Sequence, residues 1–224
     1  MARRSGNLAS CAQDFVRSAF TPHFGGLAAG FASHPAWSRL RALGTELWLD
    51  TGSLDESAKL WTREFAALTT NNTLLNAEVQ KGLYDAFIGE AAKLLAPFNL
   101  SEREHALEIA FLLNARHGLR LVETYDAFVS VEEHTDLAHD PDRAVETARR
   151  YHAICPERFL VKIPFIPAGL LATRRLAADR VPVNHTLGFS ARQNYVIARV
   201  ARPAFVNVFL GRLNAFVADN RLGD

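Results

Sequence analysis

One lysine lies in an apolar run, where its amine would have unusual chemistry. Lys162 sits between Val161 and Ile163 in the apolar run Phe159–Pro164. An ammonium group loses hydration among such neighbours, which favours the neutral, nucleophilic amine. Amines of this kind attack carbonyl groups and form Schiff bases, which act as electron sinks when a neighbouring carbon–carbon bond breaks. A lysine with a buried stem and a solvated head explains the same pattern, so Lys162 needs support from other residues.

Two acidic residues at the ends of other apolar runs suit the proton transfers of imine chemistry. Asp50 ends the run Glu46–Asp50, and Glu132 ends the run Ala127–Glu132. Imine formation and bond cleavage both need a general acid or base, and carboxylates serve in either role. Acids in such places also cap helices or form ion pairs, so a structural role explains each of them equally well.

Uncharged and basic residues near the ends of further runs suit a hydroxylated, phosphorylated ligand. Asn71 and Asn184 could bind hydroxyl groups, although asparagine is also a common turn residue. Arg212 could hold a phosphate through its planar fork of donors, or it could be an ordinary surface arginine.

The histidines give little support for a metal site. His134 and His139 are five residues apart, a spacing that matches no helical face, so we expect no metal ligands there. His185 lies between two polar residues, and we expect it on the helix side of its strand.

Short apolar runs alternate with segments of helical periodicity from residue 45 onward. The runs are Glu46–Asp50, Leu68–Asn71, Ala127–Glu132, Phe159–Pro164, Val181–Thr186 and Ala204–Leu210. Runs that are apolar on both faces are typical of parallel strands covered by helices. In a parallel (β/α) barrel of TIM type the strand ends converge on one rim, so the polar residues above would share a pocket. An open doubly wound sheet is the alternative, but no G-x-G-x-x-G pattern follows the first run.

The remaining segments predict helices. Residues 1–44 are expected to form an N-terminal helical extension, and residues 45–224 a barrel domain. Between the second and third runs, we expect two helices over Ala77–Leu95 and Ser101–His117, separated near a proline. A further helix is expected from residues at helical spacing, which are Leu54, Ala58, Trp61, Phe65 and Leu68.

Composition excludes several classes of protein. With 49% hydrophobic and 22% charged residues, the chain of 224 residues is neither disordered nor collagen-like and can bury a sizeable core. A net charge of +1 provides no strong field for nucleic acid or an anionic membrane. No apolar stretch is long enough to span a bilayer. Two distant cysteines, Cys11 and Cys155, favour a reducing cytoplasm over a disulfide framework.

Six motifs, in chain order, resemble the transaldolase family. They are LWLDT (Leu47–Thr51), LTTN (Leu68–Asn71), FVSVE (Phe128–Glu132), LVKIP (Leu160–Pro164), VNHTLGFS (Val183–Ser190) and FLGR (Phe209–Arg212). The lysine and asparagine motifs are the most specific. The resemblance implies a (β/α) barrel and an enzyme of the pentose phosphate pathway. Such an enzyme transfers a dihydroxyacetone unit from a ketose phosphate, such as sedoheptulose 7-phosphate or fructose 6-phosphate, to an aldose phosphate.

The resemblance also implies a role for each site residue. Lys162 would form the imine with the C2 carbonyl, and Asp50 would take the proton of the C4 hydroxyl. Glu132 with Thr186 would hold the water used for proton transfer. Contacts to the sugar phosphate are implied for Asn71, Asn184, Asn207, Phe209 and Arg212, the last of them at the phosphate. No metal and no organic cofactor is implied.

The chain departs from the family pattern at single residues and in length. Asn72 stands where proline is usual, and Asn207 where a serine is common. An eight-unit barrel would need two more strand–helix units after Arg212, so we expect six units and an exposed apolar strand edge. Three explanations stay open, namely a longer parent chain, completion by another chain as in a homo-oligomer, and a degenerate product. We favour the first.

Two other functions stay open. A fructose-6-phosphate-type aldolase of the same superfamily would release dihydroxyacetone without an acceptor. Tyrosine accompanies aldolase behaviour at the position of Phe209, so phenylalanine favours the transferase. A non-catalytic barrel subunit is the alternative of a different class, but a buried Lys162 costs stability and has no purpose in it.

Overall fold

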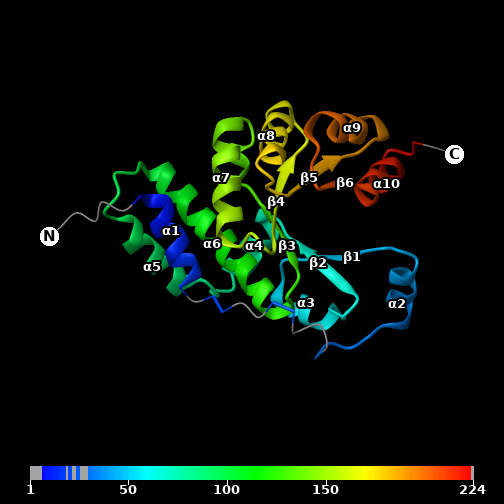
Figure 1. The fold of residues 1–224 in the computed structure, drawn as a ribbon, viewed down its shortest axis with the longest axis horizontal. Coiled ribbons are helices and arrows are strands. Elements are labelled where there is room, and N and C mark those ends of the chain that lie inside the picture. The colour runs from blue at the N-terminus through cyan, green and yellow to red at the C-terminus, as the bar shows by residue number, and fades with distance from the viewer. Residues whose placement is uncertain (1–6, 19, 22–23, 26–29, 223–224) are drawn as a thin grey trace. The chain divides into compact units, whose positions relative to one another are not determined.

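The computed structural model describes residues 7–18, 20–21, 24–25 and 30–222. These residues form two compact units. The first takes in the described residues up to His134 together with Arg150–Leu160, and the second takes in Thr135–Arg149 and the described residues from Val161 onward. Six strands occur in the order β1-β2-β3-β4-β5-β6, and a helix follows each of them (Figure 1). This order confirms the predicted barrel-type fold with six strand–helix units.

The first unit is built on the strands β1 (Leu47–Asp50), β2 (Phe65–Thr69) and β3 (Phe128–Glu132), with the start of β4 (Phe159–Pro164). The neighbours β1–β2 and β2–β3 are parallel. Its helices are α1 (Leu8–Arg17), α2 (Pro35–Ala42), α3 (Leu54–Leu60), α4 (Asn72–Val79), α5 (Asp85–Leu95) and α6 (Glu102–Tyr125). In Figure 1, α1 lies beside α5 and α6, and Phe15 stacks on Phe87 with ring centroids 4.9 Å apart.

The core of the first unit lies between α6 and β3. Leu119 and Leu121 of α6 and Val131 of β3 are fully buried. Gly118 allows this close approach, because a Cβ at that position would lie 2.8 Å from Val131 Cγ1 and 2.9 Å from Phe159 Cζ. Helix α6 ends at Tyr125, and its C-cap Asp126 has a left-handed backbone (φ 47°) that turns the chain into β3.

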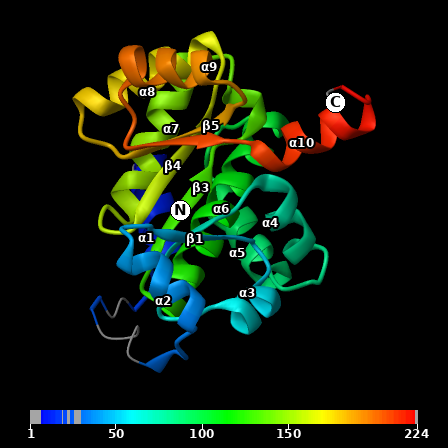
Figure 2. The same cartoon turned by 90° about the vertical axis from the view of Figure 1, so that its right-hand side faces the viewer.

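The second unit holds the rest of β4, together with β5 (Val183–Gly188) and β6 (Phe205–Val208), which pair in parallel. Its helices are the first part of α7 (Pro141–Ile154), then α8 (Pro167–Ala178), α9 (Ala191–Val196) and α10 (Leu210–Asp219). A π-helix, Ile197–Ala201, continues α9. Figure 2 shows α8 and α9 on the same side of β5.

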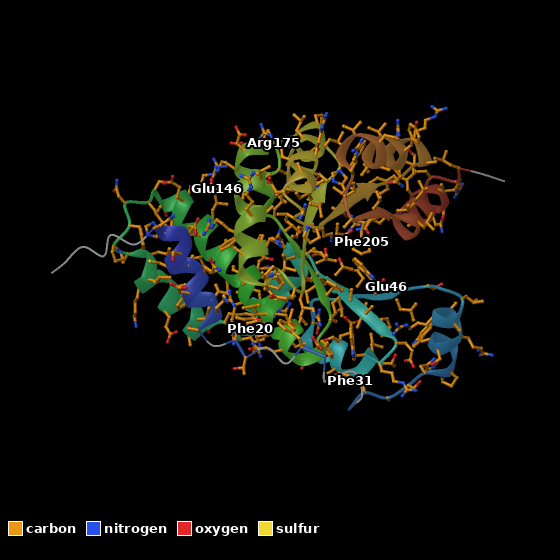
Figure 3. All side chains as sticks on the ribbon, in the orientation of Figure 1. Phe20, Phe31, Glu46, Glu146, Arg175 and Phe205 are labelled. Carbon is orange, nitrogen blue, oxygen red and sulfur yellow. The ribbon has the colours of Figure 1, made fainter. Side chains whose placement is uncertain are left out.

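Strand β6 exposes apolar side chains. Phe205, which Figure 3 labels, is 36% exposed, and Val206 and Val208 are exposed as well. The expectation of an exposed apolar strand edge is therefore confirmed for this strand. No helix in the described part of the chain is both long and apolar enough to cross a membrane.

Two predictions about the elements were wrong. Phe65 and Leu68 belong to β2 and not to a helix, because α3 already ends at Leu60. Three helices, not two, lie between β2 and β3, since α4 begins at Asn72 and a turn separates it from α5. Gly82 provides the positive φ (76°) that this turn requires.

A matched pair of helical glycines tests the packing of the first unit. We expect Gly118→Ala to lower the free energy of unfolding by about 1–3 kcal/mol, because the added methyl group overpacks the contact between α6 and β3. In Gly89→Ala of α5 the added methyl group meets open space, and the free energy of unfolding should rise by about 0.5–1 kcal/mol. Urea unfolding of both variants measures the difference, and equal effects would contradict the packing described here.

Candidate active site

Lys162 is buried in β4 and is 6% exposed. In the register of β4 and β5, Lys162 lies opposite Asn184, and Ile163 lies opposite His185. Because partners in register project from the same face of a sheet and successive residues alternate, Lys162 and Asn184 share one face, and Ile163 and His185 share the other.

Helix α8 covers the face that carries His185. His185 Nδ1 lies 3.0 Å from Thr173 Oγ1 of α8, and both residues are buried. The prediction that His185 packs on the helix side of its strand is therefore confirmed. Burial lowers the pKa of His185 to about 4, so its ring is neutral at pH 7. It follows that Lys162 and Asn184 lie on the face of β4 and β5 opposite to α8.

The polar residues that follow along β5 and β6 continue this face. Thr186 is buried and lies two residues after Asn184, so both project from the same side of β5. Asn207 Nδ2 donates to Thr186 Oγ1 over 3.4 Å, which is a long hydrogen bond. The structure therefore brings Asn207 of β6 to Thr186.

The last two predicted residues of the second unit contact each other. The guanidinium carbon of Arg212 lies 5.0 Å from the centroid of the Phe209 ring. Phe209 in turn packs edge to face against Phe189, with ring centroids 5.5 Å apart. The Phe209 ring therefore supports the guanidinium by a cation–π contact near the start of α10, where Arg212 is exposed.

In the first unit, strand register places the two predicted acids on one face. Asp50 lies opposite Thr69, and Thr69 lies opposite Ser130. Glu132 follows Ser130 by two residues, so it projects from the same face as Asp50. Asp50 is exposed and Glu132 is half-buried. On the other face of the same strands, Leu68 and Val129 are fully buried.

Asn71, which was predicted at or near the end of a strand, lies two residues beyond the end of β2. Its Oδ1 accepts the N–H of Leu74 at 2.9 Å and caps the N-terminus of α4. Asn71 therefore has a local structural role, as asparagine commonly does where a strand leads into a helix. Because the cap uses the amide oxygen, the amide nitrogen is the group that could donate to a ligand.

Sequence reasoning assigned no role to three residues around Glu132, which are Asn72, Asn114 and Glu133. The backbone N–H and the Nδ2 of Asn72 both donate to Glu132 Oε2, each over 3.0 Å. Asn72 Nδ2 also donates to the carbonyl of Glu133 at 3.0 Å, and Asn114 Nδ2 donates to Asn72 Oδ1 at 3.1 Å. No periodicity or motif indicates these contacts, which join residues far apart in the chain.

Glu133 is a buried acid beside Glu132. Its side chain is 2% exposed, and neither carboxyl oxygen has a hydrogen-bond partner among the described residues. Burial, and secondarily the charge of Glu132, raises the pKa of Glu133 to about 8. Glu133 is therefore mostly protonated at pH 7. In the described part of the chain, no three His, Cys, Asp or Glu side chains group in a way that could hold a metal ion.

Comparison with known proteins decides the family. A family model described as Transaldolase/Fructose-6-phosphate aldolase matches residues 47–222. The chain belongs to this family. The predicted resemblance to transaldolases is thereby confirmed, and the match takes in every residue assigned to the candidate site.

Individual relatives cover most of the chain. A transaldolase of Mycolicibacterium smegmatis is 29% identical over 183 residues, which are 74% of this chain and 47% of the relative. A probable transaldolase of Thermus thermophilus is 36% identical over 175 residues, 75% of this chain and 64% of the relative. A transaldolase of Neisseria gonorrhoeae is 32% identical over 167 residues, 70% of this chain and 47% of the relative. The chain thus spans about half to two thirds of the length of these relatives.

The buried carboxyl of Glu133 predicts a stability change with pH. Its pKa is raised in the folded protein, so the folded state binds more protons between the ordinary value of 4.5 and about 8. The contribution of Glu133 to stability is therefore fully present below pH 4.5 and is lost as the pH rises through about 8. We expect Glu133→Gln to remove this loss, which is on the order of 4 kcal/mol between pH 5 and pH 9. Urea unfolding of both proteins at pH 5 and pH 9 measures it, and parallel pH dependences would contradict the buried, unpartnered carboxyl.

Proposed function

We propose that this chain catalyses transaldolase chemistry through a Schiff base on Lys162. The observation that carries the proposal is the burial of this amine on the face of β4 opposite to α8, in register with Asn184. Membership of the transaldolase/fructose-6-phosphate aldolase family supports it, as do the names of the relatives.

The proposed reaction transfers a dihydroxyacetone unit between sugar phosphates. The Lys162 amine attacks the C2 carbonyl of a ketose phosphate, and the carbonyl oxygen leaves as water when the imine forms. Asp50 takes the proton of the C4 hydroxyl, the C3–C4 bond breaks, and an aldose phosphate leaves. The electron pair of that bond remains as an enamine on Lys162. The enamine carbon then adds to the aldehyde of an acceptor aldose phosphate, and water hydrolyses the new imine.

The other residues have proposed roles in binding and proton transfer. Glu132 and Thr186 would hold the water that carries protons to and from the reacting oxygens. Three asparagines would bind substrate hydroxyls, and these are Asn71, Asn184 and Asn207. Arg212 would bind the phosphate, and its contact with the Phe209 ring supports this role because the ring restrains the guanidinium and leaves its donors exposed.

We also propose that the reaction belongs to the pentose phosphate pathway and takes place in the cytoplasm. Sedoheptulose 7-phosphate and fructose 6-phosphate would be the donors. Cys11 and Cys155 are free thiols, which is consistent with a reducing compartment.

Trapping of the imine tests the proposal. We expect borohydride reduction in the presence of fructose 6-phosphate to attach a dihydroxyacetone unit to Lys162. The chain has four lysines, namely Lys59, Lys81, Lys93 and Lys162. Because an alkylated lysine resists trypsin, the adduct would leave the peptide Phe159–Arg174 intact, and mass mapping would find the added mass on it.

Two variants control this experiment. Lys162→Met keeps an apolar stem of similar length and should form no adduct, whereas Lys93→Met, at an exposed position of α5, should react like the unsubstituted chain. A folded protein that forms no adduct at Lys162, or forms it equally at Lys93, would refute the Schiff base.

An aldolase is the second candidate, since the family model covers both activities. Phe209 favours the transferase because phenylalanine has no hydroxyl to pass a proton to water. Addition of erythrose 4-phosphate to the trapping mixture separates the two. A transferase forms sedoheptulose 7-phosphate, whereas an aldolase releases dihydroxyacetone at a rate that the acceptor leaves unchanged.

A further inference from the structure

Asn72 provides two hydrogen-bond donors to the carboxylate of Glu132. Its backbone N–H and its side-chain Nδ2 converge on the same oxygen, Glu132 Oε2, and both distances are 3.0 Å. Asn72 is the first residue of α4, where the backbone N–H has no partner within the helix. An anion at this end of a helix is also favoured by the helix dipole. The carboxylate therefore receives two donors and a favourable field from α4.

The orientation of the Asn72 amide is fixed by its neighbours. Asn114 Nδ2 donates to the carbonyl of Ala110, which can only accept, and so the same nitrogen faces Asn72 Oδ1. On the other side, Asn72 Nδ2 meets the Glu132 carboxylate and the carbonyl of Glu133, which are both acceptors. Each contact requires the same orientation, so Nδ2 and not Oδ1 faces Glu132.

Asn114 anchors this network in the core. It lies in α6 and is 4% exposed, among the fully buried residues Leu112 and Ala115. A side chain held in this way has few alternative rotamers. The chain of contacts from Asn114 through Asn72 to Glu132 therefore restrains the carboxylate relative to α6.

We propose that Asn72 is a positioning residue that sets the orientation of the Glu132 carboxylate for proton transfer. This inference rests on the proposed function, in which Glu132 holds the reacting water. Asn72 itself touches no reacting atom and acts only through Glu132. A donor pair on one oxygen fixes the plane of the carboxylate, and a proton-transfer group must be held close to its productive geometry to be effective.

Substitutions at Asn72 separate its two donors. Asn72→Ala removes the amide and keeps the backbone N–H. Asn72→Pro removes both donors, and the backbone tolerates it because proline suits the first position of a helix and Asn71 before it is extended (φ −152°, ψ 169°). Asn76→Ala is the matched control, because Asn76 is exposed on the same helix and, among the described residues, its side chain hydrogen-bonds only Gln80.

The kinetic test separates positioning from a general structural effect. We expect kcat for transfer to fall about tenfold in Asn72→Ala and further in Asn72→Pro, with KM changed less than about twofold, as a lost charge-assisted hydrogen bond predicts. Asn76→Ala should match the unsubstituted chain. When Asn72→Ala is added to Glu132→Gln, kcat should fall by less than a further factor of about two. The reason is that Asn72 acts through the Glu132 carboxylate, which this background lacks.

Two results would overturn the inference. One is an equal loss of kcat from Asn72→Ala in the two backgrounds, which would mean that Asn72 acts independently of Glu132. The other is an Asn72→Pro variant that melts normally and keeps full kcat.

A second measurement does not depend on activity. The 13C resonance of the Glu132 carboxyl, assigned by its loss in Glu132→Gln, should shift in Asn72→Ala and stay in place in Asn76→Ala. An unchanged resonance in Asn72→Ala would refute the contact itself. If the unsubstituted chain forms no borohydride adduct, the proposed function fails, and this resonance still decides whether Asn72 orients Glu132.

Discussion

The proposed chemistry depends on the burial of one amine in a strand that is otherwise apolar. Lys162 lies in β4 among the buried residues Val161 and Ile163, and burial of such a group costs free energy unless the surroundings compensate it. The alternation of side chains along β4 makes the placement possible. Ile163 turns toward α8, where His185 bonds Thr173, and Lys162 turns to the opposite face with Asn184. A slip of one residue in this register would turn the amine toward the helix.

The parts of the fold that could be predicted are those governed by local pattern. The bounds of β4 were predicted as observed, because Phe159–Pro164 is apolar apart from Lys162 and is soon followed by Pro167 at the start of α8. The face of His185 followed from alternation alone. The α3–β2 boundary could not be predicted in this way. Trp61 and Phe65 fit helical spacing, yet they meet as aromatic neighbours across a turn, with ring centroids 5.4 Å apart.

The site could be predicted only as a set of residue types. The candidates Asp50 and Glu132 were found because they end apolar runs, and the register of three strands places them on one face. The contacts that restrain Glu132 could not be found from the sequence. Asn72 and Glu132 are 60 residues apart, and Asn72 was identified only as a departure from the family pattern. Such contacts depend on how α4 and α6 pack, which no local signal specifies.

The most direct test follows the oxygen at C2 of the substrate. Imine formation expels this oxygen as water, and hydrolysis returns one from the solvent. In water enriched in 18O, we predict that the chain incorporates 18O at C2 of fructose 6-phosphate faster than the spontaneous exchange, and that Lys162→Met reduces incorporation to the spontaneous rate. Release of the aldose phosphate with no incorporation above that rate would contradict the central claim.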